Sequence, residues 1–214
     1  MERDRTEAGR ALAGVLGRLA GLDPVVVGLP PGAVPIAYEV ARGLQAPMDV
    51  LVVSRLRPPG RPDLAIGAVA EDGTCVVNEP LAGILGLSAT ALAHIKGRAR
   101  DDLARQVLAL RNGHPMVPVE GRLVLIVDDG LLTGSSAATA ARVARSRGAE
   151  RVVVASPHAT EEGAETVRSE ADELVLLTPE HPIDSLPSLF SGGPVTEQQA
   201  LALLDRARAT ARAS

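Results

Sequence analysis

The sequence predicts an α/β domain in which a doubly wound, mostly parallel sheet is flanked by helices and carries a β-hairpin. Short aliphatic runs alternate with helical segments through most of the 214 residues, which is the pattern of successive β-α-β units. The run at residues 123–127 contains no polar residue, as expected of a strand buried on both faces. A chain of this length can bury one sizeable core, so we expect a single domain over residues 1–214.

The first elements form one β-α-β unit. An N-terminal helix is indicated by apolar residues at helical spacing, which are Leu12, Val15, Leu16 and Leu19. A short buried strand is expected at residues 25–28, and Pro30-Pro31-Gly32 then forces a turn. A helix over residues 34–44 and a strand over residues 49–54 follow. Their connection should be right-handed.

A loop, a hairpin and a long helix come next. Residues 55–63 contain too many prolines for a helix or a central strand, and they include three arginines. A hairpin is expected over residues 66–78, with Asp72-Gly73 as the pair most typical of a type I′ turn. Ser88 is placed to cap a helix whose apolar residues recur every three or four positions up to Asn112-Gly113. We expect the basic residues of this helix to form a solvent-exposed face.

The second half continues the alternation of helices and strands. After the run at residues 123–127 we expect a helix at 137–147, a strand at 151–155, a helix at 161–171 and a strand at 173–177. Residues 179–194 contain repeated prolines and are expected to be irregular. An alanine-rich helix capped by Thr196 is expected to close the chain at residues 195–212.

Composition excludes several classes of protein. The net charge is −4 and the only aromatic residues are Tyr38 and Phe190, so the chain lacks the basic surface and stacking rings of a nucleic-acid-binding protein. Cys75 is the only cysteine, which rules out an intramolecular disulfide. No apolar stretch approaches the length of a membrane span, and the four histidines lack metal-ligand spacing and are expected at the surface or in loops. We expect a cytoplasmic protein that binds neither membranes nor nucleic acids.

The most informative segment follows the apolar run at residues 123–127. Asp128 and Asp129 appear where this strand leaves the core, at the edge where open α/β sheets bind ligands. Gly130 then makes a turn, and residues 133–136, Thr-Gly-Ser-Ser, open a helix. Unpaired N–H groups and the helix dipole make such an opening a phosphate site. The segment predicts a ribose 5-phosphate ligand, although single residues of these types also occur as ordinary turns and helix caps.

Three other phosphate-associated motifs do not fit. No lysine follows Gly134, which excludes a Walker A loop. Neither residues 28–32 nor the later loop supplies the Gly-x-Gly-x-x-Gly of dinucleotide-binding folds. A response-regulator receiver also fails, because the strand at residues 151–155 is followed by Ser-Pro where receivers carry the phosphorylated aspartate.

The order of strand, acid pair, glycine and Thr-Gly-Ser-Ser closely resembles the 5-phosphoribosyl-1-pyrophosphate (PRPP) loop of the type I phosphoribosyltransferases. Residues 28–35, Gly-Leu-Pro-Pro-Gly-Ala-Val-Pro, resemble the pyrophosphate loop of that family. Residues 54–71 look like the flexible loop and hairpin of a bacterial subgroup of predicted phosphoribosyltransferases. The likeness spans residues 1–178, and residues 179–194 correspond to the family's hood, the small C-terminal region that holds the acceptor base.

The resemblance implies a type I phosphoribosyltransferase fold and a PRPP-dependent activity in nucleotide metabolism or nucleoside salvage. The 5-phosphoribosyl group would pass from PRPP to a nitrogenous base, with release of pyrophosphate. Asp128 and Asp129 would be the catalytic residues and would hold the ribose diol. Mg²⁺ would be the cofactor, carried by PRPP and in contact with Asp128 or Asp129 through water. A homodimer is also implied.

The resemblance assigns the other contacts residue by residue. The 5′-phosphate would be bound by Gly130, Leu131, Leu132, Thr133, Gly134, Ser135 and Ser136. The pyrophosphate would contact Pro31, Gly32 and Arg55, with help from other arginines of residues 55–63. Phe190 would contact the base.

Two departures from the family pattern leave an alternative open. The subgroup's Pro-Arg-Gly-Gly is here Pro-Pro-Gly-Ala at residues 30–33, so a cationic contact to pyrophosphate is missing at Pro31 unless Arg55 compensates. Purine-salvage members often carry an aspartate at the position of Leu132, where it can contact the base. A non-catalytic module that binds PRPP or a nucleotide 5′-monophosphate is therefore the alternative to an enzyme.

Overall fold

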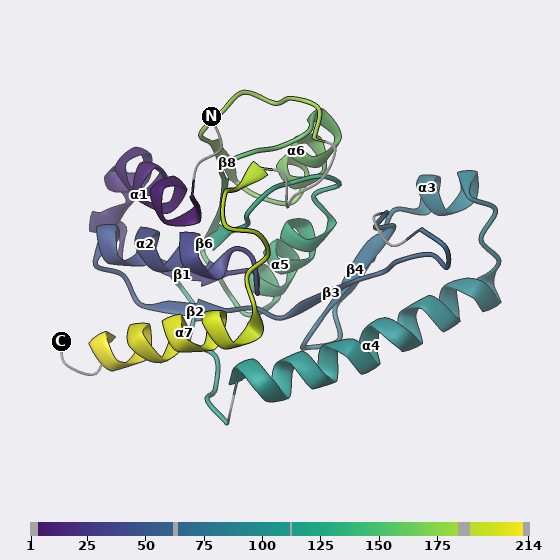
Figure 1. Ribbon diagram of the computed structural model, residues 1–214, viewed down its shortest axis with the longest axis horizontal. Coiled ribbons are helices and arrows are strands. Elements are labelled where there is room, and N and C mark those ends of the chain that lie inside the picture. The colour runs from purple at the N-terminus through teal and green to yellow at the C-terminus, as the bar shows by residue number, and fades with distance from the viewer. Residues whose placement is uncertain (1–3, 62–63, 112, 184–188, 212–214) are drawn as a thin grey trace.

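The computed structural model describes residues 4–61, 64–111, 113–183 and 189–211 (Figure 1). Its centre is a parallel sheet in the order β2-β1-β6-β7-β8. The strands are β1 (Val25–Gly28), β2 (Met48–Val50), β6 (Leu123–Val127), β7 (Arg151–Ser156) and β8 (Glu173–Leu176). The chain winds outward from β1 on one side and from β6 on the other, so the carboxyl ends of these two strands form the switch point at which such sheets bind ligands. The predicted doubly wound sheet is confirmed.

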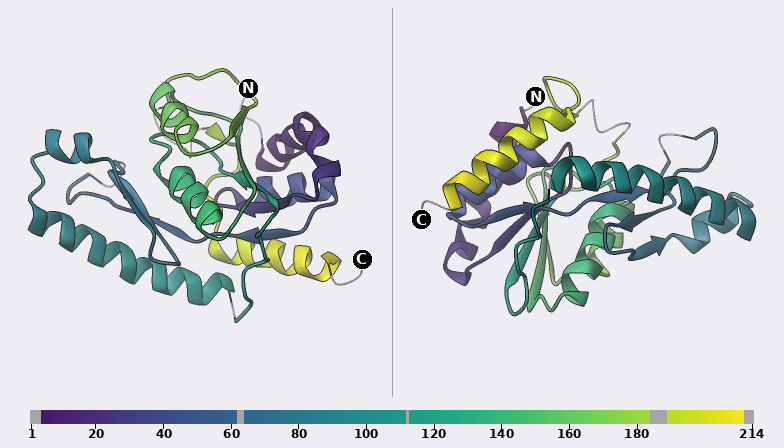
Figure 2. Two further views of the ribbon diagram at one scale, coloured as in Figure 1. Left: turned by 180° about the vertical axis from the view of Figure 1, so that it is seen from behind. Right: turned by 90° about the horizontal axis from the view of Figure 1, so that it is seen from below.

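Helices cover both faces of this sheet (Figures 1 and 2). One face is covered by α1 (Arg5–Leu16), α2 (Val34–Leu44) and α7 (Glu197–Ala211), and the other by α5 (Ser135–Ser146) and α6 (Glu161–Arg168). Alternate residues of β6 enter the two layers, with Leu125 and Val127 in the first and Val124 and Ile126 in the second. Because all residues of β6 are buried, this strand could be read from its unbroken apolar run.

The predicted strand over residues 49–54 is wrong, because the segment forms two strands in different sheets. β2 ends at Val50, and β3 (Val53–Arg55) starts a separate antiparallel sheet with β4 (Gly67–Ala70) and β5 (Cys75–Val77). Leu51 and Val52 join the two strands and are 1% and 0% exposed. The apolar run therefore continues while the chain changes sheet, and the pattern alone does not show the break.

The predicted hairpin is confirmed, but its turn is of another type. The Gly73 N–H donates to Ala70 O at 2.9 Å, and the Ala70 N–H donates to Thr74 O at 2.8 Å, which encloses a three-residue loop. Gly73 has a φ of 90°, whereas Asp72 is not among the described non-glycine residues at positive φ. A type I′ turn needs positive φ at both central residues, so the longer loop with one glycine replaces it.

Two helices complete the lobe that extends away from the main sheet (Figure 1). The short helix α3 (Glu79–Ile84) was not predicted; the Asn78 side chain caps it by accepting the Leu81 N–H at 3.0 Å. The long helix α4 (Ala89–Arg111) begins after Ser88, whose hydroxyl accepts the Ala91 N–H at 3.2 Å. The predicted cap and helix are confirmed, while Asn112 lies outside the described residues.

Arg111 ties this lobe to the main sheet. Its guanidinium donates to both carboxylate oxygens of Asp49 on β2, at 2.9 and 3.0 Å, and to Glu71 after β4. Asp49 also accepts the Val117 N–H at 2.7 Å. These three charged side chains are each at most 10% exposed. The expected solvent-exposed basic face of α4 is therefore wrong at Arg111, which is a buried and well-paired cation.

The ends of the chain largely follow the predicted pattern. In α1 and the following 3₁₀ turn (Gly17–Leu22), three of the four predicted core residues are buried, but Val15 is 52% exposed. In α7, Thr196 and Gln199 cap one another, with the Gln199 N–H on the Thr196 hydroxyl and the Thr196 N–H on Gln199 Oε1. Of the helices in the described ranges, none combines the length and apolar character needed to cross a membrane.

Candidate functional site

The two predicted acids lie together at the carboxyl end of β6, the central strand. Asp128 is 4% exposed and Asp129 is 7% exposed. The Asp128 N–H donates to Ala155 O on β7 at 3.1 Å, and the Asp128 carboxylate accepts the Asp129 N–H at 2.9 Å. These bonds fix both carboxyl groups at the switch point between β1 and β6.

Burial, together with the negative charge of Asp129, raises the pKa of Asp128 to about 7. The positive charge of Arg55 and the hydrogen bond from the Asp129 N–H oppose this rise. Asp128 therefore exchanges between its acid and carboxylate forms near neutral pH. A carboxyl group so perturbed in the wall of a cavity is a candidate functional group.

Residues 130–136, the phosphate loop, connect the acid pair to the first turn of α5. Gly134 has a φ of 67°, and a Cβ at this position would lie 2.4 Å from Gly163 O, so only glycine fits. The hydroxyls of Thr133 and Ser135 share a hydrogen bond of 3.0 Å. The first N–H groups of α5 have no acceptor within the helix and stand at the positive end of its dipole. The loop thus has the local geometry of an anion site.

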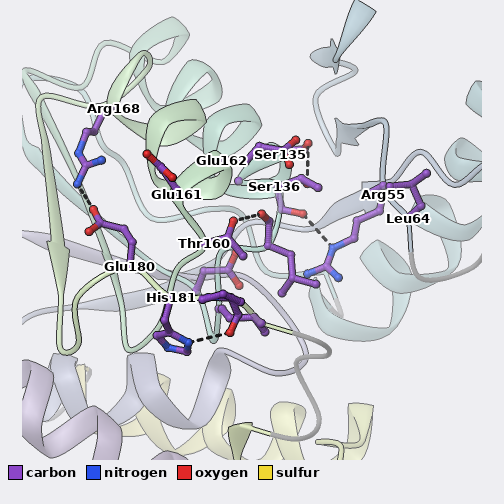
Figure 3. A pocket seen from close by; sticks show the side chains of 18 residues that line it. Arg55, Leu64, Ser135, Ser136, Thr160, Glu161, Glu162, Arg168, Glu180 and His181 are labelled. Carbon is purple, nitrogen blue, oxygen red and sulfur yellow. Dashed lines mark hydrogen bonds and ion pairs between the residues drawn. The ribbon is translucent and has the colours of Figure 1, made fainter. Parts of the chain in front are cut away.

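A cavity of about 800 Å³, the larger cavity, opens in front of the phosphate loop (Figure 3). Its other walls come from residues 160–162 and 180–183, together with Asp128 and Arg55. Arg55 Nε donates to Ser136 Oγ at 3.3 Å, and Arg168 pairs with Glu180 on the far wall, as Figure 3 shows. Arg55, predicted to contact pyrophosphate, therefore stands beside the phosphate loop.

A second cavity of about 290 Å³, the smaller cavity, lies against residues 29–32 and both acids. Arg55 and Asp128 line both cavities. A Cβ on Gly32 would lie 2.1 Å from Asp129 Oδ2, so the backbone of the predicted pyrophosphate loop touches the acid pair. The Pro30-Pro31 peptide in this loop is cis. The structure thus brings Pro31, Gly32 and Arg55 together with the acids.

Arg5, the first residue of α1, is a site residue that sequence analysis missed. Its Nη2 donates to Asp129 Oδ2 at 3.2 Å, and its Nη1 donates to Gly193 O at 2.8 Å. Asp129 is 124 positions away along the chain. Since no local pattern marks such a partnership, only the folded structure could show it.

Phe190 lies beside the two cavities rather than among their described lining residues. It is 3% exposed; its ring meets His158 edge-on, with centroids 5.9 Å apart, and supports the Arg5 guanidinium at 4.3 Å. His158 and His181 lie in loops, as predicted, and their rings are joined by a 3.2 Å contact from Nδ1 to Nε2. Contact between Phe190 and a base stays a prediction, and little of the ring is open to a ligand. Residues 184–188 of the predicted hood lie outside the described residues.

The donor set fits Mg²⁺ that arrives with a phosphorylated substrate. Within the described ranges, no three His, Cys, Asp or Glu side chains gather into a metal-binding group. Asp128 and Asp129 nevertheless offer two buried carboxylates in the wall of the smaller cavity. Mg²⁺ commonly uses one or two protein carboxylates and completes its shell with water and substrate phosphates.

Comparison with known proteins establishes the family. The family model described as the phosphoribosyl transferase domain matches residues 5–186, a range that includes both loops and the acid pair. The chain belongs to the phosphoribosyltransferase family. The fold and the recognition predicted from the PRPP loop are thereby confirmed.

Individual phosphoribosyltransferase relatives agree with this assignment. Two curated relatives, from Mycobacterium tuberculosis H37Rv and CDC 1551, are each named "Putative phosphoribosyl transferase" and are 40% identical over 212 residues, or 95% of this chain. The chain spans 46% of the length of these relatives. The crystal structure of TT1426 from Thermus thermophilus matches with a TM-score of 0.76 and 37% identity, over 94% of this chain and 96% of that one. AQ2163 from Aquifex aeolicus, with a TM-score of 0.52, 11% identity and coverage of 88% and 86%, shares the fold.

Proposed function

We propose that this protein transfers the 5-phosphoribosyl group of PRPP to a nitrogenous base and releases pyrophosphate. The observation that carries the proposal is the position of the acid pair: Asp128 lines both the cavity at the phosphate loop and the cavity at residues 29–32, and Asp129 lines the second of these. PRPP has an anionic group on either side of its ribose diol, and its chemical order matches this order of loops and acids. Membership of the phosphoribosyltransferase family supports the same reaction.

In the proposed complex, the 5′-phosphate accepts hydrogen bonds from the backbone N–H groups of residues 133–136, and the ribose hydroxyls donate hydrogen bonds to Asp128 and Asp129. Hydrogen bonds to charged groups contribute about 1.5–3 kcal/mol each, so these contacts can fix the position of C1′. The pyrophosphate lies against Gly32 and Arg55, which line the smaller cavity. Mg²⁺, held by the two carboxylates through water, would neutralise charge on the leaving group.

The proposed reaction exchanges one bond at C1′. The C1′–O bond breaks and its electron pair leaves on pyrophosphate, while the acceptor nitrogen supplies the pair for the new bond and loses its proton to the released pyrophosphate or to water. Positive charge builds up on the ribose ring, and the buried Asp128 and Asp129 carboxylates lie where they can stabilise it. Positioning of the two reactants supplies the rest of the acceleration.

The larger cavity would receive the acceptor. Leu132 of the phosphate loop lines it, and so do residues 181–183 of the hood. An aliphatic side chain at this position cannot exchange a proton with a base. The acceptor is therefore bound by the shape and the polar groups of this cavity, and it is not a base that needs a carboxylate at residue 132.

A second candidate function is a non-catalytic module that binds PRPP or a nucleotide 5′-monophosphate. Two departures favour this alternative: Pro31, where the subgroup usually carries an arginine, and Leu132, where purine-salvage members often carry an aspartate. Such a module would use the same phosphate loop and acid pair without releasing pyrophosphate. Assembly as a homodimer and a cytoplasmic location stay predictions.

One experiment separates these possibilities. The protein is incubated with PRPP, Mg²⁺ and a panel of nitrogenous bases, and pyrophosphate release is followed, together with PRPP binding by calorimetry. Asp128→Asn/Asp129→Asn is the test variant, and Asp102→Asn, on an exposed part of α4, is the matched control.

We expect base-dependent release that is lost in the double variant and kept in the control. PRPP binding with no release for any base would favour the binding module, and absence of PRPP binding would overturn the transferase.

A further inference from the structure

Arg5 and Arg111 are the buried arginines of the described residues, and they are paired very differently. Their side chains are 8% and 10% exposed. Arg111 donates to both oxygens of Asp49 and also to Glu71. Arg5 contacts a single carboxylate oxygen, on Asp129, and its buried Nε has no hydrogen-bond partner. Arg5 therefore holds a desolvated positive charge whose donors are incompletely used, which is unusual for a purely structural side chain.

The position of Arg5 is fixed from two sides. Its guanidinium lies 4.3 Å from the centroid of the Phe190 ring, and its Nη1 donates to Gly193 O. Both residues belong to the segment that leads into α7, on the side of the sheet that α1 also covers. This support holds the guanidinium in place at the edge of the site without using its remaining donors.

Arg5 lines the smaller cavity together with residues 29–32. Asp129 Oδ2 contacts both Arg5 and this loop, since it accepts a hydrogen bond from Arg5 and lies 2.1 Å from the position of a Cβ on Gly32. Pro31, the position at which the subgroup's loop usually carries an arginine, lines this cavity as well. Arg5 thus places a positive charge in the cavity that Pro31 lines without contributing a charge.

Charge in the smaller cavity favours a polyanion. Its lining contains three arginines, Arg5, Arg55 and Arg57, against two acids, Asp128 and Asp129. The pyrophosphate group carries several negative charges and many acceptor oxygens, and guanidinium groups bind such oxygens in pairs. A cavity of about 290 Å³ with this lining suits that group better than it suits an uncharged base.

We propose that Arg5 is a pyrophosphate-binding residue, supplied by the N-terminal helix in place of the arginine that is missing at Pro31. The inference rests on the proposed function and adds a residue to the same site. When pyrophosphate or PRPP binds, the unused donors of Arg5 take phosphate oxygens. Arg5 keeps its contacts with Phe190 and Gly193. Its guanidinium can bind phosphate oxygens because Asp129 uses only part of its hydrogen-bonding capacity.

The test compares three ligands by calorimetry: pyrophosphate with Mg²⁺, PRPP with Mg²⁺, and ribose 5-phosphate, which lacks the leaving group. The variants are Arg5→Gln, which keeps a hydrogen-bond donor but no charge, and Arg5→Lys, which keeps the charge. Arg10→Ala is the matched control, because Arg10 lies on the same helix, pairs with Glu39 and has a side chain 66% exposed. Thermal unfolding reports whether each variant is folded.

We expect Arg5→Gln to weaken the binding of pyrophosphate and of PRPP about tenfold or more, and the binding of ribose 5-phosphate less than about twofold. Arg10→Ala should leave the affinity for all three ligands unchanged. The pyrophosphate affinity of Arg5→Lys should lie between those of Arg5→Gln and the unaltered protein. Adding Pro31→Arg to Arg5→Gln should recover pyrophosphate affinity, which a merely structural role of Arg5 would not allow.

Unchanged pyrophosphate affinity in a folded Arg5 variant, or equal losses for all three ligands, would overturn the inference. If the unaltered protein binds neither PRPP nor ribose 5-phosphate, the proposed function itself fails, and this inference fails with it.

Discussion

Replacing Asp128 with asparagine should make the folded protein more stable at pH 8, even though it damages the candidate site. Burial and the Asp129 charge raise the pKa of Asp128 from 3.8 to about 7. The folded state therefore binds this proton more tightly than the unfolded state does. The contribution of Asp128 to stability is fully present below pH 3.8, is lost as the pH rises to about 7, and changes no further above that.

The size of the effect follows from the two pKa values. A rise from 3.8 to about 7 corresponds to about 4 kcal/mol of unfolding free energy, since each pKa unit is worth about 1.36 kcal/mol. Asparagine carries no such proton, and its Oδ1 can still accept the Asp129 N–H that now donates to Asp128 at 2.9 Å. Asp128→Asn should therefore gain up to about 4 kcal/mol over the unaltered protein between pH 4 and pH 8.

Urea unfolding at a series of pH values measures this difference. We expect the free energy of unfolding of the unaltered protein to fall, relative to Asp128→Asn, as the pH rises from 4 to 7. Asp102→Asn changes an exposed carboxylate on α4 and should follow the unaltered protein at every pH. Parallel curves for Asp128→Asn and the unaltered protein would refute the reasoning, because they would mean that burial does not penalise the Asp128 carboxylate.

Four further outcomes are expected. Changing both Asp128 and Asp129 to asparagine should weaken PRPP binding tenfold or more by calorimetry, because charge-assisted bonds to the diol are lost; unchanged affinity would contradict the ribose assignment. A crystal soaked with ribose 5-phosphate should place the phosphate on the backbone of residues 133–136, and any other position would contradict the phosphate loop. Transfer to hypoxanthine or guanine should be feeble even where PRPP binds, since Leu132 cannot supply the roughly 10²–10⁴-fold of general acid–base catalysis; robust turnover in a pyrophosphate-release assay would show the opposite. Arg111→Met should cost about 3–5 kcal/mol in urea unfolding by leaving buried carboxylates unpaired, and a loss below about 1 kcal/mol would count against the buried network.

The parts of the fold that rest on local pattern were predictable from the sequence. The all-aliphatic β6 and the acids that follow it placed the central strand and its carboxyl edge correctly. The hairpin at Asp72-Gly73 and the cap at Ser88 could likewise be predicted from the sequence, because turn and capping preferences depend on a few adjacent residues. The missed helix α3 had a comparable signal, an asparagine cap followed by proline in the first turn.

The parts that failed depend on tertiary partners. The break between Val50 and Val53 leaves no mark, since Leu51 and Val52 are as buried as the strands around them. Arg5 and Arg111 look like other surface arginines in a helical pattern, and only their distant carboxylate partners draw them inside. Long charged side chains cannot be assigned to a site from spacing alone when the partner lies in another element.

The close approach of Gly32 to Asp129 limits how this protein can be changed by mutation. Any side chain at residue 32 would have to displace the carboxylate, because a Cβ would lie 2.1 Å from Asp129 Oδ2. Both of this chain's departures from the subgroup's loop pattern fall on either side of this glycine, at Pro31 and Ala33. Laboratory redesign of leaving-group recognition should therefore diversify residues 31 and 5 together and leave residue 32 as glycine, since a library randomised at residue 32 would consist mostly of variants with a displaced acid.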